Sequence, residues 1–228
     1  MFSNFVEWIR KGERRVTEAW AYDISTPEGR RRANMHALLI DHGFLRLFWT
    51  NLYEVTAGVW RSNQPDRKRL EKYKKMGIRT IINLRGQSAS GFYKFEKRSC
   101  HRKKIDLLNV RMSARQLTDR GELLKLLDYF ETAQKPMLIH CKSGADRAGL
   151  ASALYLLHIE KTPIEIAKKQ LSLRYAHIRS SKTGILDFML DTYQQDTKPT
   201  PIPIREWIEH NYDREALTNE FAKLRGKS

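Results

Sequence analysis

The sequence predicts an α/β fold in which a central sheet is flanked by helices. Short apolar runs typical of buried strands, such as residues 80–84 and 137–139, alternate with longer segments of helical periodicity. Glycine and capping residues separate the two kinds of segment. Alternation of this kind is typical of a sheet whose strands are connected by helices packed on its faces.

The first predicted elements lie between residues 53 and 88. Residues 53–60 are expected to form a strand that enters the domain. Asp66 is a suitable N-cap for a basic helix over residues 67–76, and Gly77 is expected to end that helix. The apolar residues 80–84 then predict a strand, and the polar residues after it predict a turn.

The middle of the chain predicts a second strand–helix pair. We expect a strand over residues 105–112 and a helix over residues 119–134, with Thr118 as its N-cap. One apolar stripe on this helix comprises Leu123, Leu124, Leu127 and Phe130.

The last third of the chain predicts mainly helices. The expected helices cover residues 149–159, 163–175, 180–193, 204–210 and 214–224. Three prolines stiffen the segment 197–203 between them. We therefore expect three parts: an N-terminal helical extension (1–50), a central domain (51–196), and a proline linker with C-terminal helices (197–228).

Composition indicates a globular chain with a strong positive charge. Of the 228 residues, 41% are hydrophobic, which suffices for a core. Lys and Arg number 42 against 26 Asp and Glu, a formal net charge of +16 that favours anionic partners. Basic runs at 10–15, 30–32, 67–75 and 97–104 can equally be solvated helix faces.

Nucleic acid is not an expected partner, because no recognition motif accompanies the charge. Anionic lipid fits better, because the first residues set an apolar group against a basic one. The apolar group is Phe2, Phe5, Val6, Trp8 and Ile9, and the basic group is Arg10, Lys11, Arg14 and Arg15. This segment is expected either to rest on an anionic membrane surface or to pack on the domain.

Residues 140–149 form the most informative motif, with the sequence HCKSGADRAG. The motif follows a predicted buried strand and opens a predicted helix. A glycine-containing turn at a helix N-terminus presents backbone N–H groups to an anion, and Arg147 adds a planar fork of donors. Cys141 lies in the same positive field, which favours its thiolate form. A nucleotide-binding loop requires Gly-Lys followed by Ser or Thr, and this order is lacking.

The motif resembles the HC-x5-R signature of the cysteine-dependent protein tyrosine and dual-specificity phosphatases, and residues 59–157 resemble compact bacterial members of that superfamily. The resemblance implies a phosphatase-like fold with the catalytic loop between a strand and a helix. It further implies that Cys141 is the nucleophile and that Arg147 binds the phosphoryl group. The implied substrate-binding residues are Lys142, Ser143, Gly144, Ala145 and Ala148.

The general acid is the point where the sequence departs from this family. The resemblance predicts an aspartate in the loop 113–117, but that loop contains no carboxylate. Asp146 resembles the aspartate that precedes the arginine in CX4DR loops of phosphoinositide phosphatases. It is expected either to donate a proton or to anchor the loop through hydrogen bonds. Asp106 and Asp119 are the remaining candidates.

The expected function is hydrolysis of phosphomonoesters through a phosphocysteine intermediate. Substrates are expected among phosphotyrosine or phosphoserine proteins or anionic phospholipids. Two alternatives stay open: a pseudophosphatase that only binds phosphate, and a rhodanese-like sulfurtransferase that also uses a loop cysteine. No metal or other cofactor is expected, because no cluster of ligands occurs at metal-binding spacing.

The two cysteines, Cys100 and Cys141, indicate a reducing compartment. A catalytic thiolate would be lost in a structural disulfide, and the first residues lack the features of a secretory signal. We therefore expect a cytoplasmic protein, with a peripheral membrane contact as an additional expectation. Cys100 is either a redox partner that protects Cys141 or a bystander.

Overall fold

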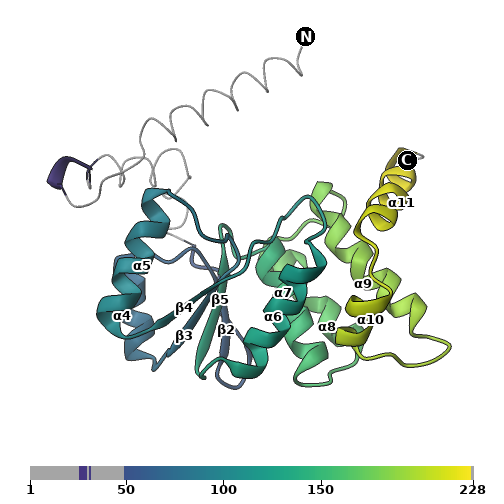
Figure 1. Cartoon of the computed structure of the whole chain (residues 1–228), viewed down its shortest axis with the longest axis horizontal. Helices are drawn as coiled ribbons and strands as arrows, with labels where there is room; N and C mark the ends of the chain where they lie inside the picture. Colours follow the sequence, from purple (N-terminus) through teal and green to yellow (C-terminus); the bar gives the residue numbers. More distant parts are fainter. Residues whose placement is uncertain (1–25, 30, 32–48, 227–228) are drawn as a thin grey trace, which may run out of the picture.

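The computed structural model describes residues 26–29, 31 and 49–226 (Figure 1). The predicted membrane-facing segment at residues 2–15 lies outside these residues, as does most of the predicted N-terminal extension. Among the described helices, none is both long enough and apolar enough to cross a membrane.

A five-stranded sheet forms the centre of the domain. Its strands are β1 (Tyr53–Thr56), β2 (Val59–Asn63), β3 (Thr80–Asn83), β4 (Asp106–Asn109) and β5 (Met137–Cys141). Their order across the sheet is β1-β2-β5-β3-β4. The edge strand β1 is antiparallel to β2, and all other neighbours are parallel. The predicted α/β class is therefore confirmed.

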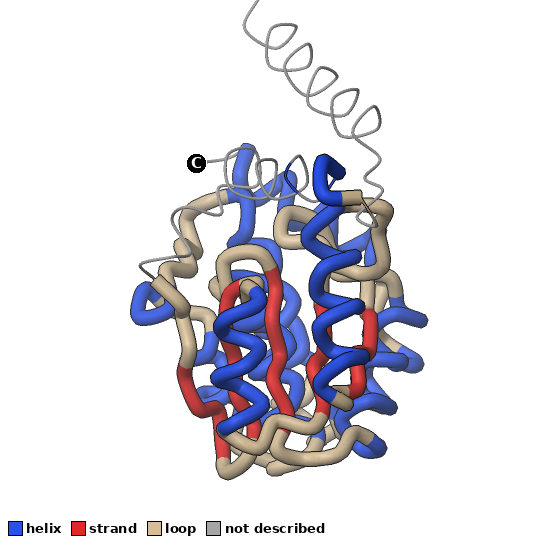
Figure 2. The backbone as a smooth tube through the Cα atoms, turned by 90° about the vertical axis from the view of Figure 1, so that its left-hand side faces the viewer, coloured by secondary structure: helices blue, strands red, loops and turns tan. Residues whose placement is uncertain are grey.

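Helices cover both faces of this sheet (Figures 1 and 2). On one face lie α4 (Arg67–Lys75) and α5 (Gly91–Lys103), and on the other lie α6 (Arg120–Thr132) and α7 (Asp146–His158). Successive strand residues alternate between the faces, so Leu138 joins the smaller apolar cluster under α4 and α5. Ile139 and Cys141 join the larger cluster under α6 and α7.

The chain after α7 continues the larger cluster. It forms α8 (Ile164–Ala167), η1 (Lys168–Gln170), η2 (Leu173–Tyr175), η3 (Lys182–Gly184), α9 (Ile185–Asp196), α10 (Ile204–His210) and α11 (Arg214–Gly226). Trp207 of α10 is fully buried. The Tyr212 hydroxyl donates to the Thr118 carbonyl at 2.6 Å, and Arg120 Nη2 donates to the Tyr212 carbonyl at 2.6 Å. The C-terminal helices thus share the core of the domain.

Several local predictions were wrong. Residues 53–60 form a hairpin rather than one strand, because Gly58, with φ of 75°, allows the chain to turn between β1 and β2. Helix α5 was not expected, because its first residues follow a polar turn and its composition is basic. The predicted helix 163–175 is broken into α8, η1 and η2. The N-cap of α6 is Asp119, which accepts from the Gly121 N–H at 2.8 Å, rather than Thr118.

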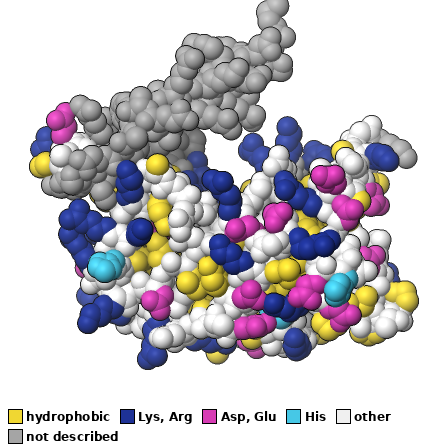
Figure 3. Space-filling view, in the orientation of Figure 1, with side chains coloured by type: hydrophobic (Ala, Val, Ile, Leu, Met, Phe, Trp, Pro, Cys, Tyr) yellow, Lys and Arg dark blue, Asp and Glu magenta, His cyan; other side chains and the backbone are white. Residues whose placement is uncertain are grey.

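The basic runs 67–75 and 97–104 lie on α4, on α5 and just after α5, where most of their Lys and Arg side chains are exposed. On the face shown in Figure 3, basic side chains gather at the α4 and α5 side, whereas acidic and basic side chains intermingle toward α9–α11. These two runs therefore form solvated helix faces, which was one of the two interpretations of the basic runs in the sequence.

Candidate active site

The HCKSGADRAG motif joins the central strand β5 to α7 at the carboxyl edge of the sheet. β5 pairs in parallel with β2 on one side and β3 on the other, so the carboxyl ends of all three meet here. Cys141 is the last residue of β5 and pairs with Asn63 at the end of β2. Crevices outside this edge of an α/β sheet are common ligand sites.

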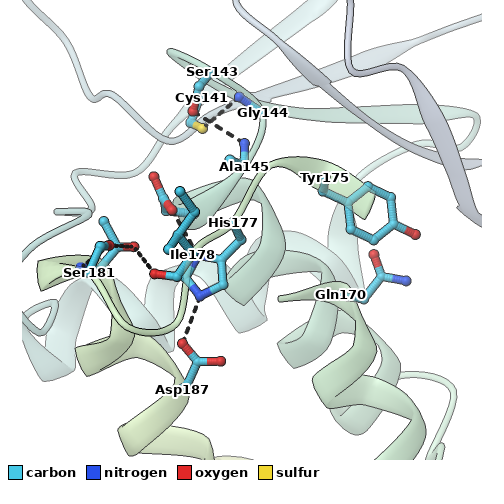
Figure 4. Close-up of polar contacts among 12 residues, drawn as sticks. Cys141, Ser143, Gly144, Ala145, Gln170, Tyr175, His177, Ile178, Ser181 and Asp187 are labelled. Atoms are coloured by element: carbon cyan, nitrogen blue, oxygen red, sulfur yellow. Dashed lines mark hydrogen bonds and ion pairs between the residues drawn. The ribbon is translucent and has the colours of Figure 1, made fainter. Parts of the chain in front are cut away.

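The Cys141 thiol is buried, with 1% of the residue exposed. Its Sγ accepts a hydrogen bond from the Gly144 N–H at 3.2 Å (Figure 4). α7 begins five residues later, and the first N–H groups of a helix lack acceptors within it. The Gly144 N–H and the start of α7 therefore place positive partial charges near the sulfur.

The turn after Cys141 requires glycine. Gly144 has φ of 75°, a left-handed conformation. A Cβ atom at this position would lie 2.7 Å from the Asn63 nitrogen and 2.8 Å from the Ser62 carbonyl carbon. These neighbours are backbone atoms of β2, so the loop passes closer to that strand than any side chain permits.

Arg61 supports the outer side of the loop from β2. Its Nη2 donates to the Gly144 and Ala145 carbonyls at 2.8 and 3.0 Å, and its Nη1 donates to the Gln170 carbonyl at 2.7 Å. The guanidinium also stacks 3.9 Å from the ring centre of Tyr175. Because a trans peptide directs its N–H away from its carbonyl, Arg61 turns two loop N–H groups toward the opposite side.

Burial lowers the pKa of Arg61 to about 10, although Tyr175, Cys141 and Asp146 oppose that effect. Arg61 therefore keeps its positive charge at neutral pH. Asn51 adds a second support, because its Nδ2 donates to the Ser143 carbonyl at 3.1 Å and to the Tyr175 carbonyl at 3.0 Å.

Arg147 occupies the first turn of α7, six residues after Cys141. Its Nε is buried, yet it has no hydrogen-bond acceptor among the described residues. A buried N–H of a charged group without an acceptor is costly. An oxyanion bound over the loop would satisfy it, and the guanidinium fork suits two oxygens of one phosphoryl group.

The remaining loop residues predicted to bind substrate differ in exposure. Lys142 and Ser143 are partly exposed, and the Ser143 Oγ accepts from the Ala145 N–H at 3.3 Å. Gly144 and Ala145 are buried. Ala148 is fully buried in the larger cluster, so only its backbone can contribute to the loop.

A polar network lies behind the strand that carries the cysteine. His140 Nε2 lies 2.8 Å from Glu96 Oε1 of α5, and the Gln64 side-chain amide donates to Glu96 Oε2 at 2.8 Å. All three side chains are buried. This arrangement connects the end of β5 to α5 and to the segment after β2, which fixes the strand at the loop.

Asp146 forms an ion pair instead of standing free. Its Oδ1 lies 2.8 Å from His177 Nδ1, and His177 Nε2 lies 2.7 Å from Asp187 Oδ2 of α9. Figure 4 shows His177 between Asp187 and the loop. Because Asp146 is already engaged with His177, its contact supports the anchoring interpretation over that of a proton donor.

Of the other two candidate acids, one lies at the opposite edge of the sheet and the other caps a helix. Asp106 begins β4 opposite Thr80 and Met137, at the amino ends of the strands and so at the edge opposite Cys141. Asp119 caps α6 through its bond to Gly121. Cys100 faces the α4 and α5 side of the sheet, whereas Cys141 faces the other side. A disulfide between them would need a large backbone movement.

Four residues around the loop were missed by sequence reasoning: Arg61, Asn51, Glu96 and His177. Each comes from a different segment and reaches the loop only through tertiary structure. The predicted strand 53–60 stopped one residue short of Arg61, so its place inside β2 was not apparent from the sequence.

Comparison with known proteins places these features in a family. The family model "PTP-SAK: Swiss Army Knife protein, DSP-PTPase phosphatase domain" matches residues 57–185. The dual specificity protein phosphatase TpbA of Pseudomonas aeruginosa is 25% identical over 113 residues, 48% of this chain and 48% of that protein. The chain thus matches about half the length of this curated relative.

Two solved structures share the fold. The catalytic domain of the PP-IP phosphatase SIW14 from S. cerevisiae gives a TM-score of 0.50 at 17% identity, covering 66% of this chain and 93% of that one. Tk-PTP in its active form gives a TM-score of 0.50 at 16% identity, covering 63% and 98%. Because the family model matches residues 57–185, more than half of the chain, the chain belongs to the PTP-SAK family of DSP-PTPase phosphatase domains.

Proposed function

We propose that this protein hydrolyses phosphomonoesters through a phosphocysteine intermediate on Cys141. The observation that carries the proposal is the pairing of two unusual groups in one loop. Cys141 Sγ accepts a backbone N–H, and the buried Arg147 Nε has no acceptor among the described residues. A phosphoryl group placed over the loop would accept from Arg147 Nε and present its phosphorus to Cys141 Sγ.

The proposed reaction has two steps. The Cys141 thiolate attacks phosphorus, while Arg147 and the N–H groups of the loop hold the non-bridging oxygens, and the alcohol leaves. Water then attacks the phosphocysteine and regenerates the thiolate. Asp146 is the group that handles a proton, and residues 142–145 with the backbone of Ala148 form the substrate cradle.

Phosphorylated proteins or anionic phospholipids are the proposed substrates. The names of the relatives support phosphorylated substrates in general: TpbA is named a dual specificity protein phosphatase and SIW14 a PP-IP phosphatase. A cytoplasmic location and a peripheral contact with anionic membrane remain predictions, as does the division into parts 1–50, 51–196 and 197–228.

A paired assay tests the proposal. The purified protein is given para-nitrophenyl phosphate in one arm and thiosulfate with cyanide in the other. We expect release of para-nitrophenol by the wild type and by Cys100→Ser, its matched control, and no turnover by Cys141→Ser. Phosphate binding without turnover in the wild type would instead identify a pseudophosphatase, and thiocyanate formation would identify a sulfurtransferase. Either result would overturn the proposal.

A further inference from the structure

A buried histidine outside the HCKSGADRAG motif connects that loop to the C-terminal helices. His177 follows η2, and its two ring nitrogens lie 2.8 Å from Asp146 Oδ1 and 2.7 Å from Asp187 Oδ2. The histidine is 1% exposed, and its backbone N–H donates to the Ser172 carbonyl at 3.1 Å. The ring is therefore fixed against the start of α7, and the backbone is fixed against the residue before η2.

This geometry determines the charge of the ring. A neutral imidazole carries one N–H, whereas two carboxylate partners require two, so both contacts are satisfied only by imidazolium. Within the described residues, the charged groups that face the ring are Asp146 from α7 and Asp187 from α9. Burial alone would lower the pKa of His177, but the hydrogen bonds and charges of the two aspartates raise it to about 9.

The contact with the ring limits what Asp146 can do. Its Oδ1 accepts the Nδ1–H of His177, so this oxygen has no proton to give to a leaving group. Asp106 and Asp119 do not replace it, for the reasons given above. An ionised carboxylate beside the loop can, however, accept a proton from water.

We propose that His177, held by Asp187, is a positioning residue that keeps Asp146 oriented as the base for hydrolysis of the phosphocysteine. The proposal rests on the proposed function. In the first step the S–P bond forms, the P–O bond breaks, and the leaving oxygen takes its proton from solvent. In the second step water forms the new P–O bond and gives a proton to Asp146, while the P–S bond breaks and the thiolate is restored.

One consequence concerns the substrate. Without a protonated carboxyl in the first step, a leaving group of low basicity departs far more easily than an alkoxide. Aryl phosphates, the class that includes phosphotyrosine, are therefore expected to react faster than alkyl phosphates such as phosphoserine or the phosphates of an inositol ring.

Stopped-flow kinetics with para-nitrophenyl phosphate separate the two steps. We expect His177→Ala to give a rapid burst of para-nitrophenol at a rate within about twofold of the wild type, followed by slow turnover as phosphocysteine accumulates. His177→Asn, which keeps one donor toward Asp146, should recover part of the second step. The matched control is His158→Asn, because His158 pairs with Glu131 at 2.6 Å at the other end of α7.

The outcome that overturns the proposal is a burst rate that falls together with turnover, which would give His177 a structural role or a role in the first step. If the wild type shows no turnover that depends on Cys141, the proposed function itself is refuted. Circular dichroism melts of each variant identify misfolding. If His177→Ala is unfolded, the pH test below on Asp187→Asn decides.

The pH dependence provides the independent test. The imidazolium persists below pH about 9, so hydrolysis of the phosphocysteine by the wild type should fall only above that pH. Asp187→Asn removes one of the two charges that raise the pKa of His177, so the fall should begin at lower pH. An unchanged midpoint in Asp187→Asn would contradict the proposal.

Discussion

The two cysteines of this chain differ in chemistry although both are 1% exposed. Cys100 lies on α5 among apolar side chains, where burial and the charge of Glu96 raise its pKa to about 12. Cys141 lies at the end of β5, and its Sγ accepts a hydrogen bond from the Gly144 N–H. Arg147 lies in the first turn of α7, six residues further along the chain. Burial among apolar side chains makes the Cys100 thiol inert, whereas the hydrogen-bond donor that the loop places at Cys141 distinguishes it from Cys100.

The largest effect is expected from replacing Arg147 in the loop that carries Cys141. Arg147→Lys keeps the charge but loses two parallel hydrogen bonds to one phosphoryl group, so kcat/KM should fall on the order of 10²-fold or more. The measurement is steady-state hydrolysis of para-nitrophenyl phosphate. Arg205→Lys is the control, because Arg205 forms a surface ion pair with Asp128 at 2.6 Å. Equal activity of the two variants would show that Arg147 does not bind substrate.

Gly144→Ala tests whether the shape of the loop, and not only its charge, distinguishes Cys141. Both Gly144 and Gly77 have positive φ, but a Cβ atom meets nothing within 4 Å at Gly77. Gly77→Ala should therefore cost only about 1–2 kcal/mol for the backbone conformation. Gly144→Ala should add a steric cost of about 1–3 kcal/mol and lose most activity. Denaturant unfolding and turnover measure the two effects, and identical results for the two variants would contradict the close approach to β2.

Alkylation measures the difference between the two thiols directly. Iodoacetate should modify Cys141 at neutral pH, while Cys100 should react only after unfolding, because the pKa of its thiol is raised to about 12. Peptide mapping by mass spectrometry gives the rate at each site. Bound phosphate should protect Cys141 and leave Cys100 unaffected. Equal rates at the two sites in the folded protein would refute the comparison.

The smallest effect is expected at the inert site. Cys100→Ala should leave turnover within about twofold of the wild type and lower the free energy of unfolding by about 1 kcal/mol, because a small buried side chain is lost. Peroxide should inactivate Cys100→Ala and the wild type at the same rate, since the two cysteines face opposite sides of the sheet. Faster irreversible inactivation of Cys100→Ala would make Cys100 a redox partner after all.

Much of this comparison could be predicted from the sequence, because it depends on local order along the chain. The strand, the glycine turn and the helix around Cys141 are consecutive, and the apolar run 137–139 marks the strand. Arg61 and His177 could not be placed in the same way. Arg61 reaches the loop because β2 pairs with β5 in parallel, and this pairing joins residues far apart in the chain. His177 contacts Asp146 across 31 positions of the chain, a tertiary contact that local patterns do not predict.

Prediction of the general acid was limited in the same way, because the sequence does not show which aspartate lies near Cys141. The sequence favoured Asp146 because it precedes Arg147 in the loop, and it left Asp106 and Asp119 as the remaining candidates. The sheet separates Asp106 from the loop, because β4 runs parallel to β3 and places Asp106 at the edge opposite Cys141, whereas Asp119 caps α6. Topology, which local patterns do not encode, therefore decides which carboxylate lies beside the cysteine.

The central claim is that Cys141, and not Cys100, carries the phosphoryl group during turnover. Its most direct test is acid quenching of the protein during hydrolysis of a radiolabelled aryl phosphate, followed by peptide mapping of the label. We predict that the label is on the peptide that contains Cys141, that it is absent from Cys141→Ser, and that it is retained in Cys100→Ser. Label on the Cys100 peptide, or hydrolysis by the wild type with no labelled peptide at any quench time, would contradict the account.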